Sequence, residues 1–357
     1  MGVMLNGFMA LDQVFQRRGP EKSHLPAFLC RCRERRQVRV QVGKGLDKAQ
    51  YSVKLIKKNY IYGNINHKVN VYVKVPRNSP FLVCMDVSLS QSEVIDPNYL
   101  WIGPDGATLK GKSYVNLTET GKLMVLGFRE HMSGSYTCTL TYRVFRNDMQ
   151  EEQERFKTYK FMVYAYREPD YAYQMSVHFT TKECNLTANE QFFEELKKIL
   201  NNLISYLTCH IIESSYKCFS VKRPKHGLVN ELFVVFQVNP FASGWETICH
   251  QVTADCEDVT NSRVQKARLL IEEFFRRQQY ILKHEYQNIP VIHYIDHSFQ
   301  VTRLDSCRPG FGKNGVSHND CANCCVACDP GSYSPNNDVV CQTCTSIRIK
   351  YYGAKSC

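Results

Sequence analysis

The chain has 357 residues, of which 43% are apolar and 22% charged, a composition typical of globular domains with buried cores. This length is long for one domain and natural for two or three. No stretch approaches the roughly eighteen continuous apolar residues that a membrane helix needs, so we expect no membrane span.

The net charge of +11 is concentrated at one end of the chain. Residues 1–58 hold 13 Lys/Arg and 4 Asp/Glu, which leaves 32 and 30, a net charge of +2, for the rest. This basic segment has few periodic apolar positions, so we expect it to be disordered and to contribute nothing to the fold. No stacking motif, zinc-finger spacing or recognition helix accompanies the charge, so we expect no nucleic-acid partner.

Seventeen cysteines and two N-glycosylation sequons indicate an oxidising compartment. The sequons predict glycans on Asn116 and Asn185. A secretory chain normally begins with a signal peptide, but the first forty residues contain no apolar core of the required kind. There are two explanations: this N-terminus comes from an alternative transcript or an imperfect gene model, or the chain stays inside the cell. We expect the first.

Residues 59–166 have the pattern of a β-sandwich. Val69, Val71, Val73 and Val75 alternate with polar residues, which is the period of a half-buried strand. Clusters of Pro, Gly, Asn and Asp then follow at intervals of about ten residues, as they do between short strands.

Four residues make this sandwich immunoglobulin-like. Cys84, Trp101 and the Tyr136-Thr-Cys138 triplet occur in the order of an immunoglobulin domain. In that fold the two cysteines bridge the sheets, the tryptophan packs on the bridge, and the tyrosine hydroxyl ties a corner. The interval between Cys84 and Trp101 is long, so we expect an enlarged loop around residues 88–98.

Residues 167–304 read as an α+β domain. Apolar residues recur at helical spacing between residues 192 and 207 and again between 262 and 284. Residues 232–236 read as a buried strand, and residues 291–301 as one or two further strands. The helices' apolar faces are expected to pack on their own sheet. His293 and His297 would share one face of a strand, but no third metal ligand lies nearby, so we expect a solvent-facing strand there.

Residues 305–357 form a small cysteine-rich repeat with a period of 20 to 21 residues. So short a repeat cannot bury a core of its own, and we expect disulfides to stabilise it, with a connectivity that the sequence leaves open. The cysteines concerned are Cys307, Cys321, Cys324, Cys325, Cys328, Cys341, Cys344 and Cys357.

The alternative for this repeat is a zinc site. Its two Cys-x-x-Cys pairs, Cys321 with Cys324 and Cys341 with Cys344, have the spacing of a tetrahedral thiolate site. The Pro-Gly turns after the leading cysteines, the adjacent Cys324-Cys325 pair and the sequons favour disulfides. We therefore expect no metal and no cofactor.

The parity of the cysteines predicts one odd thiol. Residues 58–357 contain fifteen, and if the last eight pair among themselves and Cys84 pairs with Cys138, five remain in the middle domain. Cys209 with Cys218 and Cys249 with Cys256 are expected as local pairs, which leaves Cys184. An odd thiol in a secreted chain is free or intermolecular, so we expect a fraction of disulfide-linked dimer through Cys184.

Several stretches resemble the zona pellucida-binding protein family. They are NYLWIGPDG, SGSYTC, FMVYAYREPDY, ELFVVFQVNPF, DSCRPGFGKN and CCVACDPGSYSP, and the resemblance covers about residues 58–357. It implies a sperm protein of the acrosomal vesicle, or a secreted one, that acts in binding to the egg coat and in shaping the acrosome. The implied partners are egg-coat glycoproteins and other acrosomal matrix proteins.

Binding rather than catalysis is the expected activity. The sequence contains no Gly-x-Ser-x-Gly elbow, no His-Glu-x-x-His and no phosphate-binding glycine loop. In an oxidising compartment most of its thiols would be paired and inert as nucleophiles. The alternative to egg-coat recognition is a structural matrix protein that organises the acrosome through protein contacts.

Overall fold

The computed structural model describes residues 56–57, 59–146, 151–185, 187–224, 227–251, 256–285, 292–335, 340–346 and 348–357. Residues from Lys54 to Cys357 group into one unit of the chain. Residues 1–58, for which the sequence predicts disorder, lie outside the described residues except for residues 56–57. Cys30 and Cys32 therefore also lie outside them.

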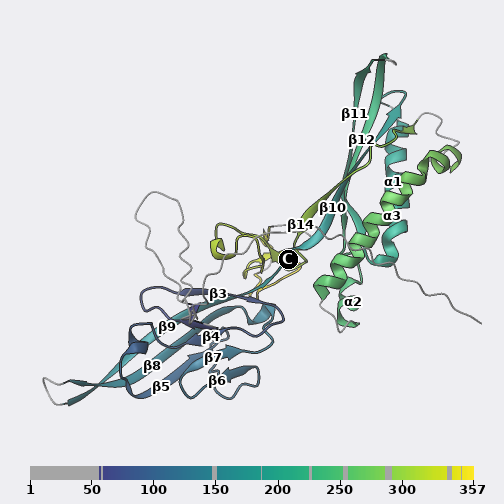
Figure 1. Cartoon of the computed structure of the whole chain (residues 1–357). Coiled ribbons are helices and arrows are strands. Elements are labelled where there is room, and N and C mark those ends of the chain that lie inside the picture. The colour runs from purple at the N-terminus through teal and green to yellow at the C-terminus, as the bar shows by residue number, and fades with distance from the viewer. Residues whose placement is uncertain are drawn as a thin grey trace, which may run out of the picture. The chain divides into compact units, whose positions relative to one another are not determined.

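The N-terminal domain is an immunoglobulin-like sandwich of two sheets (Figure 1). In the first sheet the strand order is β1-β2-β4-β7-β6, and in the second it is β15-β16-β9-β8-β5 with β3 beside β9. The first sheet consists of β1 Ile56–Lys57, β2 Tyr60–Tyr62, β4 Phe81–Val83, β6 Val115–Leu117 and β7 Lys122–Val125. The second contains β3 Val69–Lys74, β5 Ile95–Ile102, β8 Gly134–Arg146, β9 Glu151–Arg167, β15 Phe311–Gly312 and β16 Cys325–Ala327.

The core of this domain lies between the two sheets, around a disulfide and a tryptophan. Cys84 and Cys138 are bonded, and Trp101 is 1% exposed beside them, with its indole Nε1 donating to the Gly121 carbonyl at 3.0 Å. The Tyr136 hydroxyl donates to the Met132 carbonyl at 2.8 Å, which is the geometry of a tyrosine corner. Burial of apolar side chains of this size contributes about 1.5–3 kcal/mol each.

The enlarged loop expected around residues 88–98 is present, but it lies slightly earlier, between β4 and β5 at residues 84–94. It contains the 3₁₀ turn η1 Leu89–Gln91, and β5 already begins at Ile95, before an irregularity in its register between Ile95 and Asn98. A second 3₁₀ turn, η2 Glu130–Met132, precedes β8.

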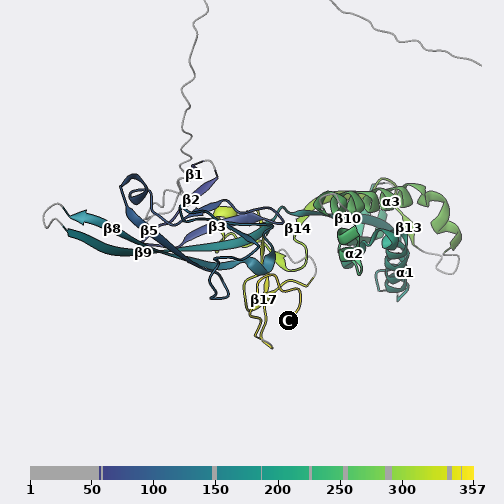
Figure 2. The ribbon, with the colours of Figure 1, turned by 90° about the horizontal axis from the view of Figure 1, so that it is seen from below.

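The hairpin of β8 and β9 is long. The two strands pair from Gly134 opposite Val163 to Arg146 opposite Glu151 without a register shift. The hairpin continues past the strands of the facing sheet (Figure 2). At its base, Asp86 holds β9 from the core side, accepting hydrogen bonds from Lys157 at 3.1 Å and Tyr159 at 3.0 Å.

The middle domain is an antiparallel sheet with helices on one face, consistent with an α+β fold. β10 Asp170–Thr181 is central, and the strand order is β11-β12-β10-β13, with β14 also pairing with β10. The strands are β11 His210–Arg223, β12 Gly227–Asn239, β13 His293–Tyr294 and β14 Gln300–Ser306. The helices are α1 Thr187–Ile204, α2 Trp245–Gln251 and α3 Cys256–Glu285, and the 3₁₀ turn η3 Ser205–Leu207 follows α1.

Side chains of alternate residues from β10 and β12 meet the apolar faces of α1 and α3. Met175, Val177 and Phe179 of β10 share this core with Phe192 of α1 and Phe275 of α3. Both helices therefore cover the same face of the sheet (Figure 1). Helix α3 begins six residues earlier than the periodicity indicated. None of the described helices is long and apolar enough to cross a membrane.

The cysteine-rich tail continues the immunoglobulin sheet. Tyr166 of β9 pairs with Lys74 of β3 on one side and Val326 of β16 on the other, so β16 takes the edge that β8 leaves after Val163. Cys307, Phe311, Cys325 and Ala327 are buried in the same core as Trp101. Beyond β16 lie the short strands β17 Ser332–Tyr333 and β18 Gln342–Thr343, and the 3₁₀ turn η4 Asn319–Cys321 lies between β15 and β16.

Candidate binding surface

The face of β5, β8 and β9 that points away from the core is partly open. Strand alternation places Trp101, Cys138 and Tyr159 side by side on the core face, so their neighbours Leu100, Thr139 and Thr158 lie opposite. We call this outward surface the outer face. Its members are Leu100, Thr139, Thr141, Phe145, Phe156 and Thr158.

The outer face exposes large apolar side chains. Leu100 is 51% exposed, Phe145 52% and Phe156 78%. Threonines lie between them, and the Oγ1 atoms of Thr139 and Thr158 are 3.4 Å apart. Exposed apolar side chains rimmed by polar groups are typical of protein interaction sites.

A charged cluster borders the outer face toward the hairpin tip. Arg143 contacts Glu152 at 2.8 Å through Nη1 and Asp96 at 2.7 Å through Nη2. Its hydrogen bond with Glu152 raises the pKa of the Arg143 guanidinium. Because the three side chains are exposed, the pairs contribute little stability and leave the charges available to a partner.

The tail covers the other end of the same sheet surface. His318 is 4% exposed, its Nδ1 lies 3.2 Å from the Tyr72 hydroxyl, and its ring meets Tyr164 edge-on at 4.7 Å. Tyr352 contacts Tyr164 from the tail as well. Burial lowers the pKa of His318 and raises that of the nearby Asp329. The tail therefore occupies the β3 side of this surface and leaves the outer face uncovered.

A glycine permits the tail to fold back on itself. Gly310 has a φ of +87°, and a Cβ there would lie 2.6 Å from the Gly353 carbonyl oxygen. Gly310 also donates to the Ser334 carbonyl and accepts from the Cys328 amide, both at 2.9 Å. A side chain at position 310 would separate these turns.

A buried ion pair joins the tail to the middle domain. Arg308 and Asp170 have side chains that are 4% and 1% exposed, and they are joined by two hydrogen bonds, at 2.7 and 3.0 Å. The Arg308 guanidinium also lies over the rings of Phe241 and Trp245. Sequence reasoning missed this contact; its one signal was an arginine next to the leading cysteine of the repeat.

A second charged group joins the middle domain to the sandwich. Glu257 at the start of α3 contacts Lys74 of β3 at 3.0 Å and Arg167 of β9 at 3.7 Å. Arg167 in turn lies 3.6 Å from Glu130. Burial lowers the pKa of the Arg167 guanidinium. These contacts hold the sandwich and the middle domain together at the point where β9 leads into β10.

The disulfides of the tail use every cysteine of the repeat. Cys307 pairs with Cys325, Cys321 with Cys324, Cys328 with Cys341 and Cys344 with Cys357. The four thiols of the alternative zinc site are thus all in disulfides. In the described residues no group of three His, Cys, Asp or Glu side chains is placed to hold a metal ion.

In the middle domain one predicted pair is wrong. Cys249 and Cys256 are bonded, but Cys218 pairs with Cys184 and not with Cys209. Cys209 immediately precedes β11 and Cys218 lies within it, so at about 3.3 Å per residue they are roughly 25–30 Å apart, beyond the reach of a disulfide.

The parity of the cysteines correctly predicted one odd thiol among the described residues, but its assignment to Cys184 is wrong. Cys184 is bonded within the chain, so the expected dimer through Cys184 has no thiol to form it. Among the described cysteines Cys209 is the unpaired one, and it is buried. Burial raises its pKa to about 12, which makes it a poor nucleophile and a poor partner for an intermolecular bond.

His293 and His297 do not form a site. His293 lies on β13, whereas His297 lies in the turn that follows and has a φ of +60°. The turn, rather than a continuous strand, separates the two side chains, so the expected shared face is wrong.

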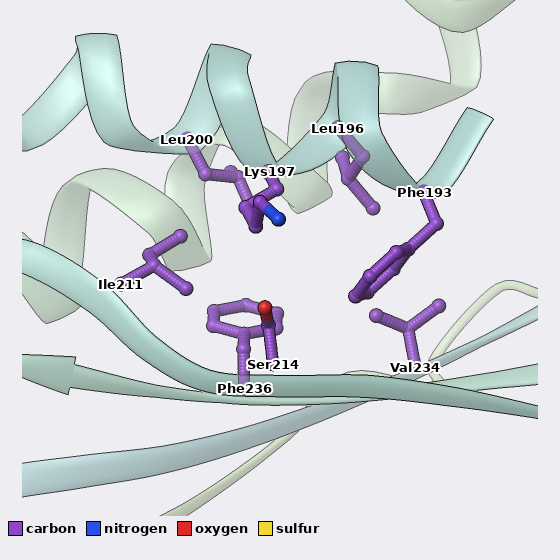
Figure 3. A pocket seen from close by; sticks show the side chains of 8 residues that line it. All are labelled: Phe193, Leu196, Lys197, Leu200, Ile211, Ser214, Val234 and Phe236. Carbon is purple, nitrogen blue, oxygen red and sulfur yellow. The ribbon is translucent and has the colours of Figure 1, made fainter. Parts of the chain in front are cut away.

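The small cavity between α1 and β11 is a packing gap (Figure 3). It holds about 10 Å³ of space open to water, roughly one water molecule at most. Apolar side chains from α1, β11 and β12, including Phe193 and Phe236, point into it (Figure 3). This cavity is too small for a ligand.

The sequon asparagines lie away from the outer face in the fold. Asn116 is exposed on β6, the edge strand of the facing sheet, and Asn185 is exposed in the turn before α1. Both are sterically open to the attachment that the sequence predicts.

Comparison with known proteins gives consistent matches along the chain. The model of the zona-pellucida-binding protein (Sp38) N-terminal Ig domain matches residues 68–167, and that of the Sp38 C-terminal EGF-like domain matches residues 307–357. Zona pellucida-binding protein 2 of Gallus gallus is 56% identical over 86% of this chain and 88% of its own length.

Two further relatives extend this result. Zona pellucida-binding protein 2 of Rattus norvegicus is 55% identical over 84% of this chain and 91% of its own length. Zona pellucida-binding protein 1 of Gallus gallus is 36% identical over 83% of this chain and 90% of its own length. The chain belongs to the zona pellucida-binding protein family.

Proposed function

We propose that this protein is a non-enzymatic binding protein that recognises egg-coat glycoproteins through the outer face of its immunoglobulin-like domain. The observation that carries the proposal is the exposure of Leu100 and Phe156 on the one part of that sheet surface which the tail leaves open. The names of the relatives supply the ligand class, because those proteins are called zona pellucida-binding.

The surface has the properties of a recognition site. Its apolar side chains stand on a sheet whose other face packs on Trp101 and the Cys84–Cys138 bridge, so the backbone that carries them is already ordered before binding. The threonine hydroxyls supply hydrogen-bonding groups between the apolar anchors. Arg143 and its two acidic neighbours add charges of both signs at the rim.

The placement of the sequons supports the same surface. A glycan on Asn116 would extend from the edge of the opposite sheet, and one on Asn185 from the middle domain. Neither would cover Leu100 or its neighbours. The outer face thus stays accessible in the glycosylated protein.

The proposal includes the location and the partners. The protein acts from the acrosomal vesicle or after secretion, where its disulfides persist. Within that vesicle it contributes to acrosome assembly through contacts with other matrix proteins.

The test is pull-down of the purified, oxidised full chain on isolated egg coats. Leu100→Glu places a charge on the β5 side of the outer face and should reduce binding by about tenfold or more, the loss typical of a hot-spot residue. Leu269→Glu on α3 is the matched control, because Leu269 is 52% exposed and Leu100 51%. The control should bind like wild type.

The solution conditions sharpen the result. Binding should survive chelators, because disulfides rather than metal hold the tail, and it should be lost on reduction. Salt should weaken it only modestly, because residues 59–357 carry little net charge. Equal loss in both leucine variants would overturn the assignment to the outer face. Absence of binding by wild type would favour the matrix-organising role alone.

A further inference from the structure

The outward edge of β9 is an unused pairing edge. On one side β9 pairs with β8 from Glu151 to Val163, and on the other β3 begins to pair only at Phe161. Within the described ranges no strand pairs with the second edge between Glu151 and Lys160. This ten-residue segment therefore presents backbone donors and acceptors to solvent.

The direction of these groups follows from one contact. The Tyr166 carbonyl accepts from the Val75 amide, so it points to the β3 side. Backbone groups alternate along a strand, and the pairing of β8 with β9 has no register shift. The backbone groups of every second residue from Glu152 to Lys160 thus point to the open edge, while their side chains lie on the outer face.

Charge along this edge is divided into two halves. Glu152 and Glu154 occupy the first half, and Arg155, Lys157 and Lys160 the second. Scattered charges normally prevent edge strands from pairing. An edge with its acidic and basic residues in separate halves can pair with itself. An antiparallel copy of the same strand places the acidic half of each strand against the basic half of the other.

We propose that a second copy of this chain pairs with the open edge of β9, forming an antiparallel dimer about a two-fold axis next to Phe156. In this register Phe156 lies opposite Phe156 of the second copy. Glu152, which Arg143 of its own chain already contacts at 2.8 Å, lies opposite Lys160 of the second copy, twice by symmetry. About ten inter-chain hydrogen bonds form, two for each directly bonded residue pair.

Neighbouring registers are less favourable. A shift of one residue exposes the wrong backbone groups, because only every second residue points to the edge. A shift that centres the axis on Arg155 or on Lys157 brings two like charges directly opposite each other. In the chosen register Arg155 lies opposite Lys157, whose charge is already paired with Asp86 at 3.1 Å. A parallel arrangement would place acid beside acid.

The consequence is a single sheet with two outer faces pointing the same way. A two-fold axis normal to the sheet keeps equivalent side chains on one surface. Both copies of Leu100 would then face the same direction. The dimer presents two copies of any ligand site on that surface, which raises avidity without a new contact.

Charge reversal tests the register. Sedimentation velocity of the full chain over a concentration series should show reversible dimers that weaken with salt, because the paired side chains are exposed. Glu152→Lys alone, and Lys160→Glu alone, should each weaken the dimer on the order of tenfold, because two attractive pairs become repulsive. The double variant should restore dimerisation, since the two charges exchange places. Glu195→Lys on α1, with the same change in charge, is the control and should have no effect.

A crosslink tests the axis independently of charge. Phe156→Cys should join two chains through a short thiol crosslinker, because residues facing each other in a bonded pair have Cα atoms about 5.5 Å apart. Thr158→Cys should not, because that position is displaced from its mate by about 13 Å along the strand. Monomers at all concentrations, failure of the double variant to restore dimers, or equal crosslinking at both positions would each overturn the proposal. Egg-coat binding by monomeric variants is a separate measurement and does not decide it.

Discussion

Asp170 and Arg308, 138 residues apart in the chain, form a doubly hydrogen-bonded ion pair that is almost fully buried. The carboxylate stands at the first residue of β10 and the guanidinium follows the first cysteine of the tail. Removal of one partner from such a pair leaves the other charged and desolvated. The pair therefore makes the middle domain and the tail dependent on each other.

We expect Asp170→Asn to destabilise the protein by about 3–5 kcal/mol, the cost of leaving a buried charge without its partner. Urea unfolding followed by fluorescence measures the change. Asp305→Asn is the control, because Asp305 pairs with Lys313 at 3.3 Å at the surface and should change stability by less than about 0.5 kcal/mol. Similar losses of stability in the two variants would show that the buried pair contributes no more to stability than the surface pair does.

Replacement of both Cys84 and Cys138 by alanine should cost about 2–5 kcal/mol, because the bridge restricts the unfolded chain and fills the core beside Trp101. Thermal unfolding under non-reducing conditions gives the comparison. A double variant as stable as wild type would be incompatible with a bridge at this position.

The thiol chemistry of the middle domain can be read by peptide mapping. We expect a disulfide-linked peptide that joins Cys184 to Cys218, and none that joins Cys209 to Cys218. Alkylation at about pH 8 should leave Cys209 unmodified in the native protein and label it after unfolding, because burial raises its pKa to about 12. Rapid native labelling of Cys209 would contradict the buried position.

Stability should fall as the pH is lowered through the histidine range. Burial lowers the pKa of His318 below its usual 6.5, so the unfolded chain binds a proton more readily than the folded one. The stabilisation is present above about pH 6.5 and is lost as the pH falls below it. We expect the melting temperature to drop between about pH 7.5 and about pH 5.5, the two sides of that value.

Variants separate His318 from the other groups. His318→Phe should reduce the drop, whereas His131→Phe, at an exposed position, should not. A residual drop is expected from His210, whose pKa burial also lowers. Asp329 shifts in the opposite direction, because burial raises the pKa of its carboxyl group. An unchanged drop in His318→Phe would remove His318 as its source.

The immunoglobulin domain could be predicted from the sequence because its characteristic residues occur in a fixed order along the chain. Cys84, Trp101 and Tyr136 each imply a definite place in that fold, and the alternation from Val69 marks a strand without knowledge of its neighbours. The helix that begins at Thr187 could be predicted for the same reason, because the apolar residues on one of its faces are recognised from their spacing along the chain alone.

Contacts between segments that lie far apart in the chain could not be predicted from the sequence in this way. The choice of Cys184 over Cys209 as the partner of Cys218 depends on how β10, α1 and β11 pack, which spacing does not reveal. His318 resembles any polar residue of a loop until the tail lies on Tyr72 and Tyr164. The outer face could not be predicted either, because the exposure of Leu100 depends on which part of the sheet the tail covers.

The burial of Phe311 and Cys325 in the core of the sandwich has a consequence for biosynthesis. The ribosome makes the N-terminal domain first and these residues among the last, so the first domain to emerge waits for the end of the chain before its sheet is complete. Until then the edge of β9 that receives β16 stays open, and the chain is exposed to mispairing for the whole of its synthesis. Chains truncated before residue 307 would therefore have a defect located in their first domain, because its core and its sheet would lack these residues.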